Sequence, residues 1–271
     1  MVTISCLVCP TNSAHRVDLL DNCINSIESQ GIVFAQKVIS VDLFRPGENK
    51  YDPSIPVNDL DFYKAKYPGW TVIGGDVVSP RSMADNQIRG LDEIKSDYVF
   101  YSDDDVVIKK IPSQATLQEL WNRNVGWINY APHTCVIFDH PPPHVADYVN
   151  NVSNYLSIND DFFMRKDITI WDSYLLHFPV AIANTEIITK LHNYAIDTYD
   201  DVVGEMGIEI GLSQAWVTIG IPNEVYIYLH PAVLDVLPLV NLYDLFYFAN
   251  ISYYRNDSSM ATPQAICGYS I

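Results

Sequence analysis

The chain opens with a strand, a helix and a second strand, and this unit strongly restricts the folds open to it. Residues 2–8 are apolar and β-rich, and a Pro-Thr-Asn-Ser sequence at 10–13 breaks that strand. Apolar residues recur at helical spacing over 16–30, and a second buried-type strand at 37–41 ends at Asp42. Such a unit favours parallel pairing through a right-handed crossover. We therefore expect an α/β fold with a mostly parallel central sheet flanked by helices.

The rest of the chain continues to alternate apolar strands with helical patterns. Residues 43–70 are rich in proline and glycine and are expected to form loops. In the helix expected at 82–94, the predicted inner face consists of Met83, Ile88, Leu91 and Ile94. Further strands are expected at 70–73, 98–101, 106–108, 125–138, 180–182 and 225–229, and further helices at 114–121, 185–194 and 208–220.

The chain is strongly acidic, with 33 Asp and Glu residues, 16 Lys and Arg residues and a formal net charge of -17. A field of this sign repels phosphate backbones and anionic lipid headgroups, so nucleic acid and membrane surfaces are poor candidate partners. A small anionic substrate would need a local cation to offset the field, and a divalent metal ion would supply one.

The sequence shows no membrane-spanning or secretory segment. No stretch reaches the roughly 18–20 consecutive apolar residues of a transmembrane helix, and the N-terminus lacks the basic region of a signal peptide. If Met1 is the native start, we expect a soluble, cytoplasmic protein without membrane insertion.

The cysteines are five in number and widely scattered. An odd, scattered set does not suggest a disulfide framework, and Cys6 and Cys9 have no second cysteine pair at zinc-site spacing. Buried structural thiols are therefore the favoured interpretation.

Three adjacent carboxylates, Asp103, Asp104 and Asp105, follow the expected strand at 98–101. Like charges this close repel one another, and a folded chain keeps them only where water or a cation screens them. Ligands of open α/β sheets bind outside the carboxyl ends of the strands, and Asp103 and Asp105 are spaced to aim at one point. Oxygen ligands of this kind suit Mg2+ or Mn2+, whereas the simplest alternative is a solvated acidic turn.

The segment Asn86-x-x-Arg89-Gly90, followed by the hydrophobic strand and Asp103-Asp104-Asp105, resembles the pattern of GT-A glycosyltransferases with a D-x-D motif. The resemblance spans roughly residues 2–108 and 178–221. It implies a Rossmann-like GT-A fold, a UDP-sugar donor and a divalent metal ion. An enzyme of this kind without signal or anchor suits a cytosolic protein of bacterial or large-DNA-virus type.

The resemblance also implies roles for individual residues. Asp105 would bind the metal, and Asp103 would contact the metal or the ribose. The loop of Pro10, Thr11 and Asn12, together with Asp42, would hold the base and its ribose, and Arg89 would meet the sugar or a phosphate. The implied nucleotide-sugar site thus comprises Pro10, Thr11, Asn12, Asp42, Asn86, Arg89, Asp103 and Asp104.

The stretch Gly207-Ile208-Glu209-Ile210-Gly211-Leu212-Ser213 resembles the helix start that carries the catalytic base of inverting members of the family. It implies that Glu209 deprotonates the acceptor hydroxyl, although Ile208 replaces the usual Glu. Nearby alternatives are Glu205, Asp200 and Asp201, and Glu209 would also suit the first turn of a helix for electrostatic reasons alone. His230, which follows a strand, is a candidate extra metal ligand, but a partly buried histidine that bonds to backbone is the slightly favoured alternative.

These expectations define one domain over residues 1–271, with a nucleotide-sugar-binding half at 1–138 and an acceptor-side half, carrying the catalytic base, at 139–271. The run Pro141-Pro142-Pro143 marks the division. The predicted reaction is metal-dependent, inverting transfer from a UDP-sugar to a hydroxyl of a glycan or other acceptor. Two alternatives remain open: a nucleotidyltransferase or other Mg2+-dependent phosphoryl enzyme, and a non-catalytic carbohydrate- or nucleotide-binding protein. Aromatic residues that could stack on sugars are Trp171, Tyr243, Tyr247, Tyr253 and Tyr254.

Overall fold

The computed structural model of the chain describes residues 1–47, 54–76, 82–108, 111–130, 155–159, 162–165, 180–198, 208–229 and 253–255. Its helices, including the short 3-10 helix η1, are η1 Ala14–Arg16, α1 Val17–Glu28, α2 Leu60–Lys66, α3 Ser82–Asp92, α4 Gln114–Asn122, α6 Thr185–Thr198 and α8 Ile208–Ile219. Its strands are β1 Ile4–Val8, β2 Lys37–Leu43, β3 Thr71–Asp76, β4 Tyr98–Ser102, β5 Val106–Ile108, β6 Val125–Tyr130, β7 Tyr155–Asn159, β8 Phe162–Arg165, β9 Val180–Asn184, β10 Glu224–Leu229 and β11 Tyr253–Arg255.

The expected strand–helix–strand opening is confirmed, and it lies in a nine-stranded sheet with the order β3-β2-β1-β4-β9-β6-β10-β8-β7. Strand β1 pairs in parallel with both β2 and β4, and β2 pairs in parallel with β3. The chain therefore builds outward from β1 to β3 on one side and then crosses to β4 on the other. The boundary between β1 and β4 is a topological switch point, where an open α/β sheet forms a crevice at the carboxyl ends of its strands.

The sheet is mostly parallel as expected, with antiparallel additions beyond β4. Strand β9 pairs antiparallel with both β4 and β6, and β10 pairs in parallel with β6. Strands β8 and β7 extend the edge in antiparallel fashion. Strands from residues 155–229 thus continue the sheet that residues 1–130 begin. The functional division into two halves stays a prediction.

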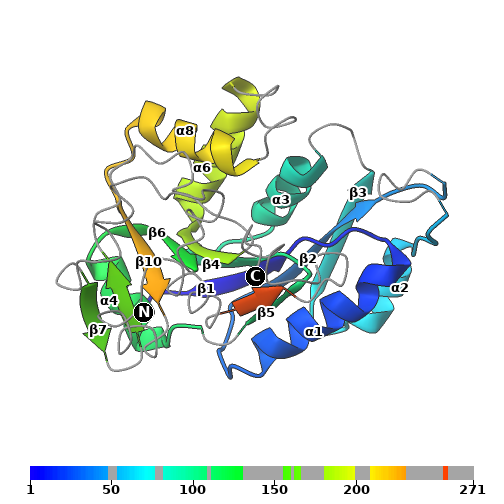
Figure 1. Ribbon diagram of the computed structural model, residues 1–271, viewed down its shortest axis with the longest axis horizontal. Coiled ribbons are helices and arrows are strands. Elements are labelled where there is room, and N and C mark those ends of the chain that lie inside the picture. Colours follow the sequence, from blue (N-terminus) through cyan, green and yellow to red (C-terminus); the bar gives the residue numbers. More distant parts are fainter. Residues whose placement is uncertain are drawn as a thin grey trace, which may run out of the picture.

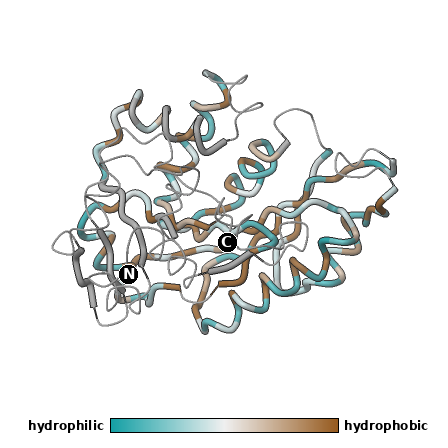
Figure 2. Tube along the Cα trace, in the orientation of Figure 1, coloured by the Kyte–Doolittle hydropathy of each residue, from teal (hydrophilic) through white to brown (hydrophobic). Residues whose placement is uncertain are grey.

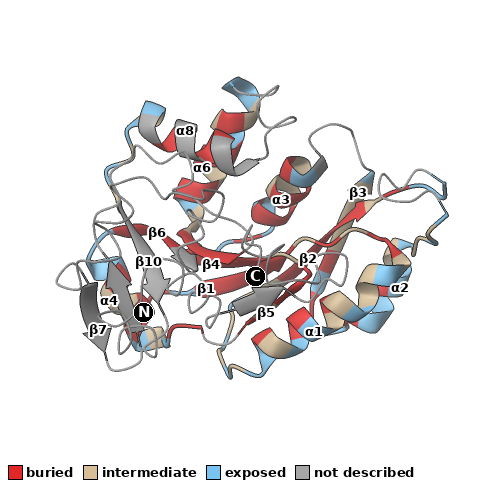
Figure 3. Cartoon of the chain, in the orientation of Figure 1, coloured by how far each residue is buried: buried red, intermediate tan, exposed pale blue. Residues whose placement is uncertain are grey.

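The core has two layers because successive side chains of a strand point to opposite faces of the sheet. Ile4, Cys6 and Val8 of β1 pack with α1 on one face, and Leu7 packs with α3, α6 and α8 on the other. Figure 1 shows this arrangement, with α1 and α2 on one side of the sheet and α3, α6 and α8 on the other. The central strands are hydrophobic (Figure 2) and buried (Figure 3), as expected for strands covered on both faces.

Helix α2 corrects the expectation that residues 43–70 form only loops. Asp59 caps the helix by accepting a hydrogen bond of 2.8 Å from the backbone N–H of Phe62. Tyr63 is buried against the core. The prolines of this segment flank the helix instead of interrupting it, so a proline-rich composition did not exclude a short helix.

The predicted inner face of α3 is also partly wrong. Met83 is 48% exposed, whereas Ala84, Asn86, Gln87 and Leu91 are buried. A search for apolar periodicity overlooks this face because two of its inward-facing residues are polar. Both of these buried amides hydrogen-bond to other parts of the fold.

The expectation of buried structural thiols is confirmed for two of the three described cysteines. Cys6 and Cys23 are buried, Cys9 is half-buried, and all three are free. In the described parts of the chain, no helix combines the length and apolar character that a bilayer crossing requires.

Candidate functional site

Three parallel strands end side by side at the topological switch point. Val8, the last residue of β1, pairs with Ser102, the last residue of β4, so the loop after β1 leaves the sheet next to the acidic turn. Backbone hydrogen bonds tie the same loop to β2: Asp42 N donates to Pro10 O at 3.0 Å, and Asn12 N donates to Asp42 O at 2.9 Å. The fold therefore brings together the predicted residues of the 10–12 loop, Asp42 and the acidic turn.

Arg16, at the end of η1, contacts the acidic turn and was not predicted as a site residue. Its Nε donates to Asp104 Oδ2 at 2.8 Å and its Nη2 to Asp104 Oδ1, while Nη2 also lies 3.6 Å from Asp105 Oδ2. Both carboxylates are almost fully buried. Arg16 is the only Lys or Arg among residues 1–36, a sequence signal that could have marked it.

Asp103 is held differently from its two neighbours in the turn. Its Oδ1 accepts a hydrogen bond of 2.9 Å from the hydroxyl of Tyr101, and its backbone carbonyl accepts bonds from Ser102 Oγ and Cys23 Sγ. Asp103 is half-buried, whereas Asp104 and Asp105 are buried. Of the three carboxylates, that of Asp103 is therefore the most accessible to a ligand.

Asp42, Asn86 and Arg89 form a second polar group at the end of β2. Arg89 Nη1 donates to Asn86 Oδ1 at 2.8 Å and lies 4.0 Å from Asp42 Oδ1. Asn86 Oδ1 also accepts from Ser40 Oγ at 2.6 Å. The Arg89 side chain is 26% exposed and the Asp42 side chain 6%. Asn86 thus sits beneath the site and orients Arg89, which presents its guanidinium to solvent.

Glycine at position 75 makes room for the guanidinium of Arg89. A Cβ atom at Gly75 would lie 2.5 Å from Arg89 Nη2, well inside van der Waals contact. Gly75 belongs to β3, so the arginine extends from α3 across the ends of β2 and β3.

Asn12 and Thr11 in the β1 loop have different roles. The Asn12 side chain donates to the carbonyls of Phe44 and Asn58 at 2.9 and 3.0 Å and accepts from Phe44 N at 3.0 Å. These bonds hold the segment after β2 against the loop after β1, so this amide is engaged within the protein. The Oγ1 atom of Thr11 is buried and has no hydrogen-bond partner among the described residues.

Cys9 lies among the charged groups of the site. Burial raises the pKa of its thiol well above the usual value, and the carboxylates of Asp42 and Asp103 raise it further. Burial likewise raises the pKa of Cys23, which lies beneath the acidic turn. Both thiols therefore stay protonated at neutral pH and are poor nucleophiles or metal ligands.

In the acidic turn, Asp103 is the carboxylate exposed enough to offer a ligand to a divalent cation, which would need further ligands from phosphate or water. Among the described residues, no group of three or more His, Cys, Asp or Glu side chains is arranged to hold a metal ion. Mg2+ in enzymes that bind nucleotides commonly takes one or two carboxylates and completes its shell with phosphate oxygens and water. Asp103 suits that role, whereas Asp105 is buried beside Arg16. Coordination of one metal ion by both carboxylates therefore stays a prediction.

The predicted catalytic base and the predicted metal ligand His230 lie outside the described side chains. Glu209 belongs to the first turn of α8, where the structure describes only its backbone. His230, with the alternatives Glu205, Asp200 and Asp201 and the aromatics Trp171, Tyr243 and Tyr247, lies outside the described residues. Tyr253 and Tyr254 belong to β11, which pairs with β5 immediately after the acidic turn.

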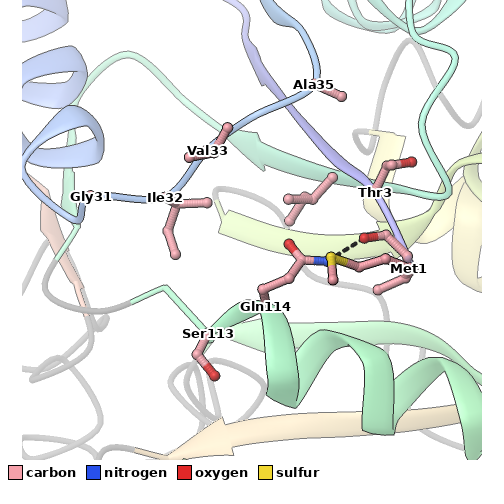
Figure 4. Close-up of a pocket in the computed structure, with 10 residues that line it drawn as sticks. Met1, Thr3, Gly31, Ile32, Val33, Ala35, Ser113 and Gln114 are labelled. Carbon is pink, nitrogen blue, oxygen red and sulfur yellow. Dashed lines mark hydrogen bonds between the residues drawn. The ribbon is translucent and has the colours of Figure 1, made fainter.

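Two cavities of the described structure lie away from this site. One, of about 510 Å3, is lined by residues before β1, residues before β2 and the start of α4, so it lies at the amino ends of the strands (Figure 4). The other, of about 630 Å3, lies between the segment before β4 and the start of α6. Neither contains a residue of the acidic turn.

Comparisons with known proteins give distant structural likenesses. No protein-family model matches the chain, and no curated protein matches its sequence. The structure is similar to S. aureus TarS 1–349, with 11% identity, 92% of this chain and 72% of that chain covered, and a TM-score of 0.48. A structure of S. aureus TarS 1–349 in complex with UDP-GlcNAc matches with 11% identity, covering 83% of this chain and 55% of that chain, at a TM-score of 0.46.

A third similar structure is 4-diphosphocytidyl-2C-methyl-D-erythritol synthase from Anaerococcus prevotii DSM 20548. It is 11% identical, with 92% of this chain and 97% of that chain covered, and the TM-score is 0.45. Similarity this distant does not identify what the present chain binds or transfers.

Proposed function

We propose that the chain is a glycosyltransferase that moves a sugar from a UDP-sugar to an acceptor hydroxyl with the help of Mn2+ or Mg2+. The observation that carries the proposal is the convergence of the β1 loop, Asp42, Arg89 and the acidic turn at the carboxyl ends of β1, β2 and β4. The resemblance to GT-A glycosyltransferases implies each of these groups at a nucleotide-sugar site, and they lie at one edge of one sheet.

The position of this cluster supports a nucleotide donor. It lies at the switch point between β1 and β4, the position at which open α/β sheets commonly bind their ligands. The backbones of Thr11 and Asp42 lie side by side, joined by an isolated β-bridge. Their side chains can accept from and donate to the hydroxyls of a ribose or the edge of a base.

The charges of the cluster support a diphosphate group bound with a cation. Four carboxylates (those of Asp42, Asp103, Asp104 and Asp105) outweigh the two guanidinium groups of Arg16 and Arg89. A diphosphate entering alone would meet net repulsion. Asp103 would hold the metal ion, and Arg89 would meet the sugar or a phosphate. A bound divalent cation stabilises the charge that builds on the departing nucleoside diphosphate.

The proposed activation of the acceptor hydroxyl depends on Glu209. A carboxylate at the start of α8 would deprotonate the acceptor hydroxyl as that hydroxyl attacks the anomeric carbon from the face opposite the leaving group. This geometry inverts the anomeric centre. The acceptor is a glycan or another molecule with a free hydroxyl.

Calorimetric titration of the full chain with UDP, with and without MnCl2, tests the donor site. We expect binding that requires Mn2+ and is weakened about tenfold or more in Asp103→Asn, as for loss of a contact to a charged group. Asp61→Asn is the matched control because this carboxylate is 90% exposed on α2. Absence of Mn2+-dependent UDP binding by the wild-type chain would contradict the proposal.

A turnover assay then separates the alternatives. A panel of UDP-sugars should show slow hydrolysis or transfer that Glu209→Gln abolishes without weakening UDP binding. Release of pyrophosphate from a nucleoside triphosphate and a sugar phosphate would instead indicate a nucleotidyltransferase. Binding of a UDP-sugar without hydrolysis or transfer to any acceptor would indicate a binding protein.

A further inference from the structure

A chain of hydrogen bonds runs from Asp103 into the core of the protein. The Tyr101 hydroxyl lies 2.9 Å from Asp103 Oδ1, and the side-chain amide of Gln87 lies 2.9 Å from the same hydroxyl. The amide of Gln87 also lies 2.8 Å from His192 Nε2, and His192 Nδ1 lies 2.9 Å from the carbonyl of Ile188. The four links join the acidic turn to β4, α3 and α6.

The interior members of this chain are sealed from water. Gln87 and His192 are fully buried, and Tyr101 is 1% exposed. They lie within the apolar core on the side of the sheet covered by α3, α6 and α8. Polar groups in such a core are costly unless hydrogen-bonded, so the direction in which each link donates matters energetically.

Both His192 and Tyr101 are uncharged at neutral pH. Burial lowers the pKa of His192 to about 4, so its imidazole is neutral and carries one proton. The phenol of Tyr101 also carries its proton at neutral pH, as an ordinary tyrosine does.

The chain is then one proton short while Asp103 is ionised. The neutral imidazole of His192 supplies one N–H and the phenol of Tyr101 one O–H. The Gln87 amide supplies one N–H, because its nitrogen faces one neighbour and its oxygen the other. The four links need one proton each. The strongest link is the one to the carboxylate, so Tyr101 donates to Asp103 and must accept from Gln87 Nε2. Gln87 Oε1 therefore accepts from His192 Nε2–H.

The missing proton falls at the link that can best tolerate its loss. His192 Nδ1 then faces the carbonyl of Ile188 without a proton. This carbonyl lies four residues before His192 within α6, so it already accepts the backbone N–H of the helix. The carbonyl keeps its helical partner, whereas Nδ1 is left as a buried acceptor without a donor, a cost that the stronger hydrogen bond to the Asp103 carboxylate offsets.

We propose that Gln87 and His192 are positioning residues for Asp103, and that the charge on Asp103 holds His192 in its Nε2–H tautomer. The Gln87 amide, held by the His192 imidazole, donates to the Tyr101 hydroxyl. Tyr101 therefore donates its single hydroxyl proton to the Asp103 carboxylate and fixes the orientation of that carboxylate. The coupling between Asp103 and His192 depends only on the hydrogen bonds. Its use in metal and donor binding rests on the proposed function.

Substitution of Asp103 by Asn supplies the missing proton. The new amide can donate to Tyr101, which then donates to Gln87 Oε1, and the Gln87 amide turns over to donate to His192 Nε2. His192 Nδ1–H then donates to Ile188, so all four links are satisfied. Asp103→Asn should therefore switch His192 from the Nε2–H to the Nδ1–H tautomer, although the side chains of Tyr101 and Gln87 lie between the two residues.

Long-range 1H–15N NMR of the imidazole groups measures this directly in the full chain. We expect the Nε2–H tautomer in the wild-type protein, the Nδ1–H tautomer in Asp103→Asn, and no switch in Asp104→Asn, whose carboxylate pairs with Arg16 instead. The same His192 tautomer in the wild-type and Asp103→Asn proteins would overturn the proposal. This reading does not require the protein to bind UDP.

The binding role is measured with UDP and MnCl2 as the probe. Gln87→Met and His192→Leu should weaken Mn2+-dependent UDP binding by about tenfold, the effect typical of residues behind a metal ligand. His192→Gln should recover much of the affinity because its amide can replace the Nε2–H donor. If all three variants bind UDP with the wild-type affinity in the presence of Mn2+, whatever their stability, the positioning role is wrong. Failure of the wild-type chain to bind UDP would instead count against the proposed function, and the tautomer reading would still decide the coupling.

Discussion

Arg16, the last residue of η1, forms a bidentate ion pair with the buried carboxylate of Asp104. The side chains of Arg16 and Asp104 are 15% and 5% exposed. The pair therefore locks the start of α1 onto the turn after β4, across the switch point of the sheet. It keeps the acidic turn in a folded arrangement that repulsion between its three carboxylates would otherwise oppose.

Removing this arginine should strongly destabilise the fold. Arg16→Ala leaves Asp104 charged and buried without its main partner, a change that costs about 3–5 kcal/mol for buried pairs. Urea unfolding followed by circular dichroism measures the loss. Arg123→Ala is the matched control because Arg123 and Glu119 are 40% and 39% exposed. The control should change stability little, since exposed pairs contribute about 0–1 kcal/mol. Similar effects of the two substitutions would contradict this account.

His192 should make the fold less stable in mild acid. Its pKa is lowered to about 4 in the folded chain, from an ordinary value of 6.5, mainly by burial. Between these two values the unfolded chain binds the extra proton, so stability falls as the pH drops from about 6.5 to about 4. Comparing urea midpoints of wild type and His192→Gln from pH 4 to pH 8 isolates this contribution. The variant should show a shallower decline, and parallel curves would contradict the prediction.

Cys9 should react slowly with alkylating agents although it is half-buried at the site. Its raised pKa leaves little thiolate at pH 8, so its alkylation should be slower than that of glutathione by more than about tenfold. Mass spectrometry of the iodoacetamide-treated full chain measures the rate at each cysteine. The urea-denatured chain, in which the raised pKa is lost, serves as the control. Rapid labelling of Cys9 in the folded chain would contradict the prediction.

Two glycines of the site region should respond differently to alanine. Gly75→Ala meets the end of the flexible Arg89 side chain, so it should displace the guanidinium and weaken Mn2+-dependent UDP binding with little loss of stability. Gly90→Ala places its Cβ against Leu7 in the packed core. That overlap costs about 1–3 kcal/mol, of which better helix propensity recovers about 1. Unfolding and UDP titrations of both variants test the contrast. Loss of stability in Gly75→Ala comparable to that of Gly90→Ala would count against it.

The fold was largely predictable from local sequence. The apolar runs of β1, β2 and β4 are long enough to be buried on both faces, and α1 has a clear apolar stripe. Helix α2 was missed because prolines dominate the composition around it. The inner face of α3 was misassigned because two of its inward residues are buried amides. In both cases a few hydrogen bonds outweighed the average character of the segment.

The candidate site was only partly predictable. The acidic triplet was identified because it follows an apolar strand, and ligands of open α/β sheets bind at the carboxyl ends of strands, whereas Asp42 was implied by the resemblance to GT-A glycosyltransferases. Arg16 and the path from Asp103 to His192 were missed. Residues 103 and 192 are far apart in the sequence, and no local pattern signals that an amide on α3 will lie between them.

The sequence by itself determined the strands, the main helices and the edge of the sheet at which the polar residues gather. These features depend on the spacing of apolar and polar residues along a short segment. Only the tertiary structure decided how the three adjacent carboxylates differ, with Asp104 and Asp105 buried beside Arg16 and Asp103 bonded to Tyr101. The physical reason is that the environment of a carboxylate depends on the partners that distant segments bring to it, and packing of the whole chain sets those partners.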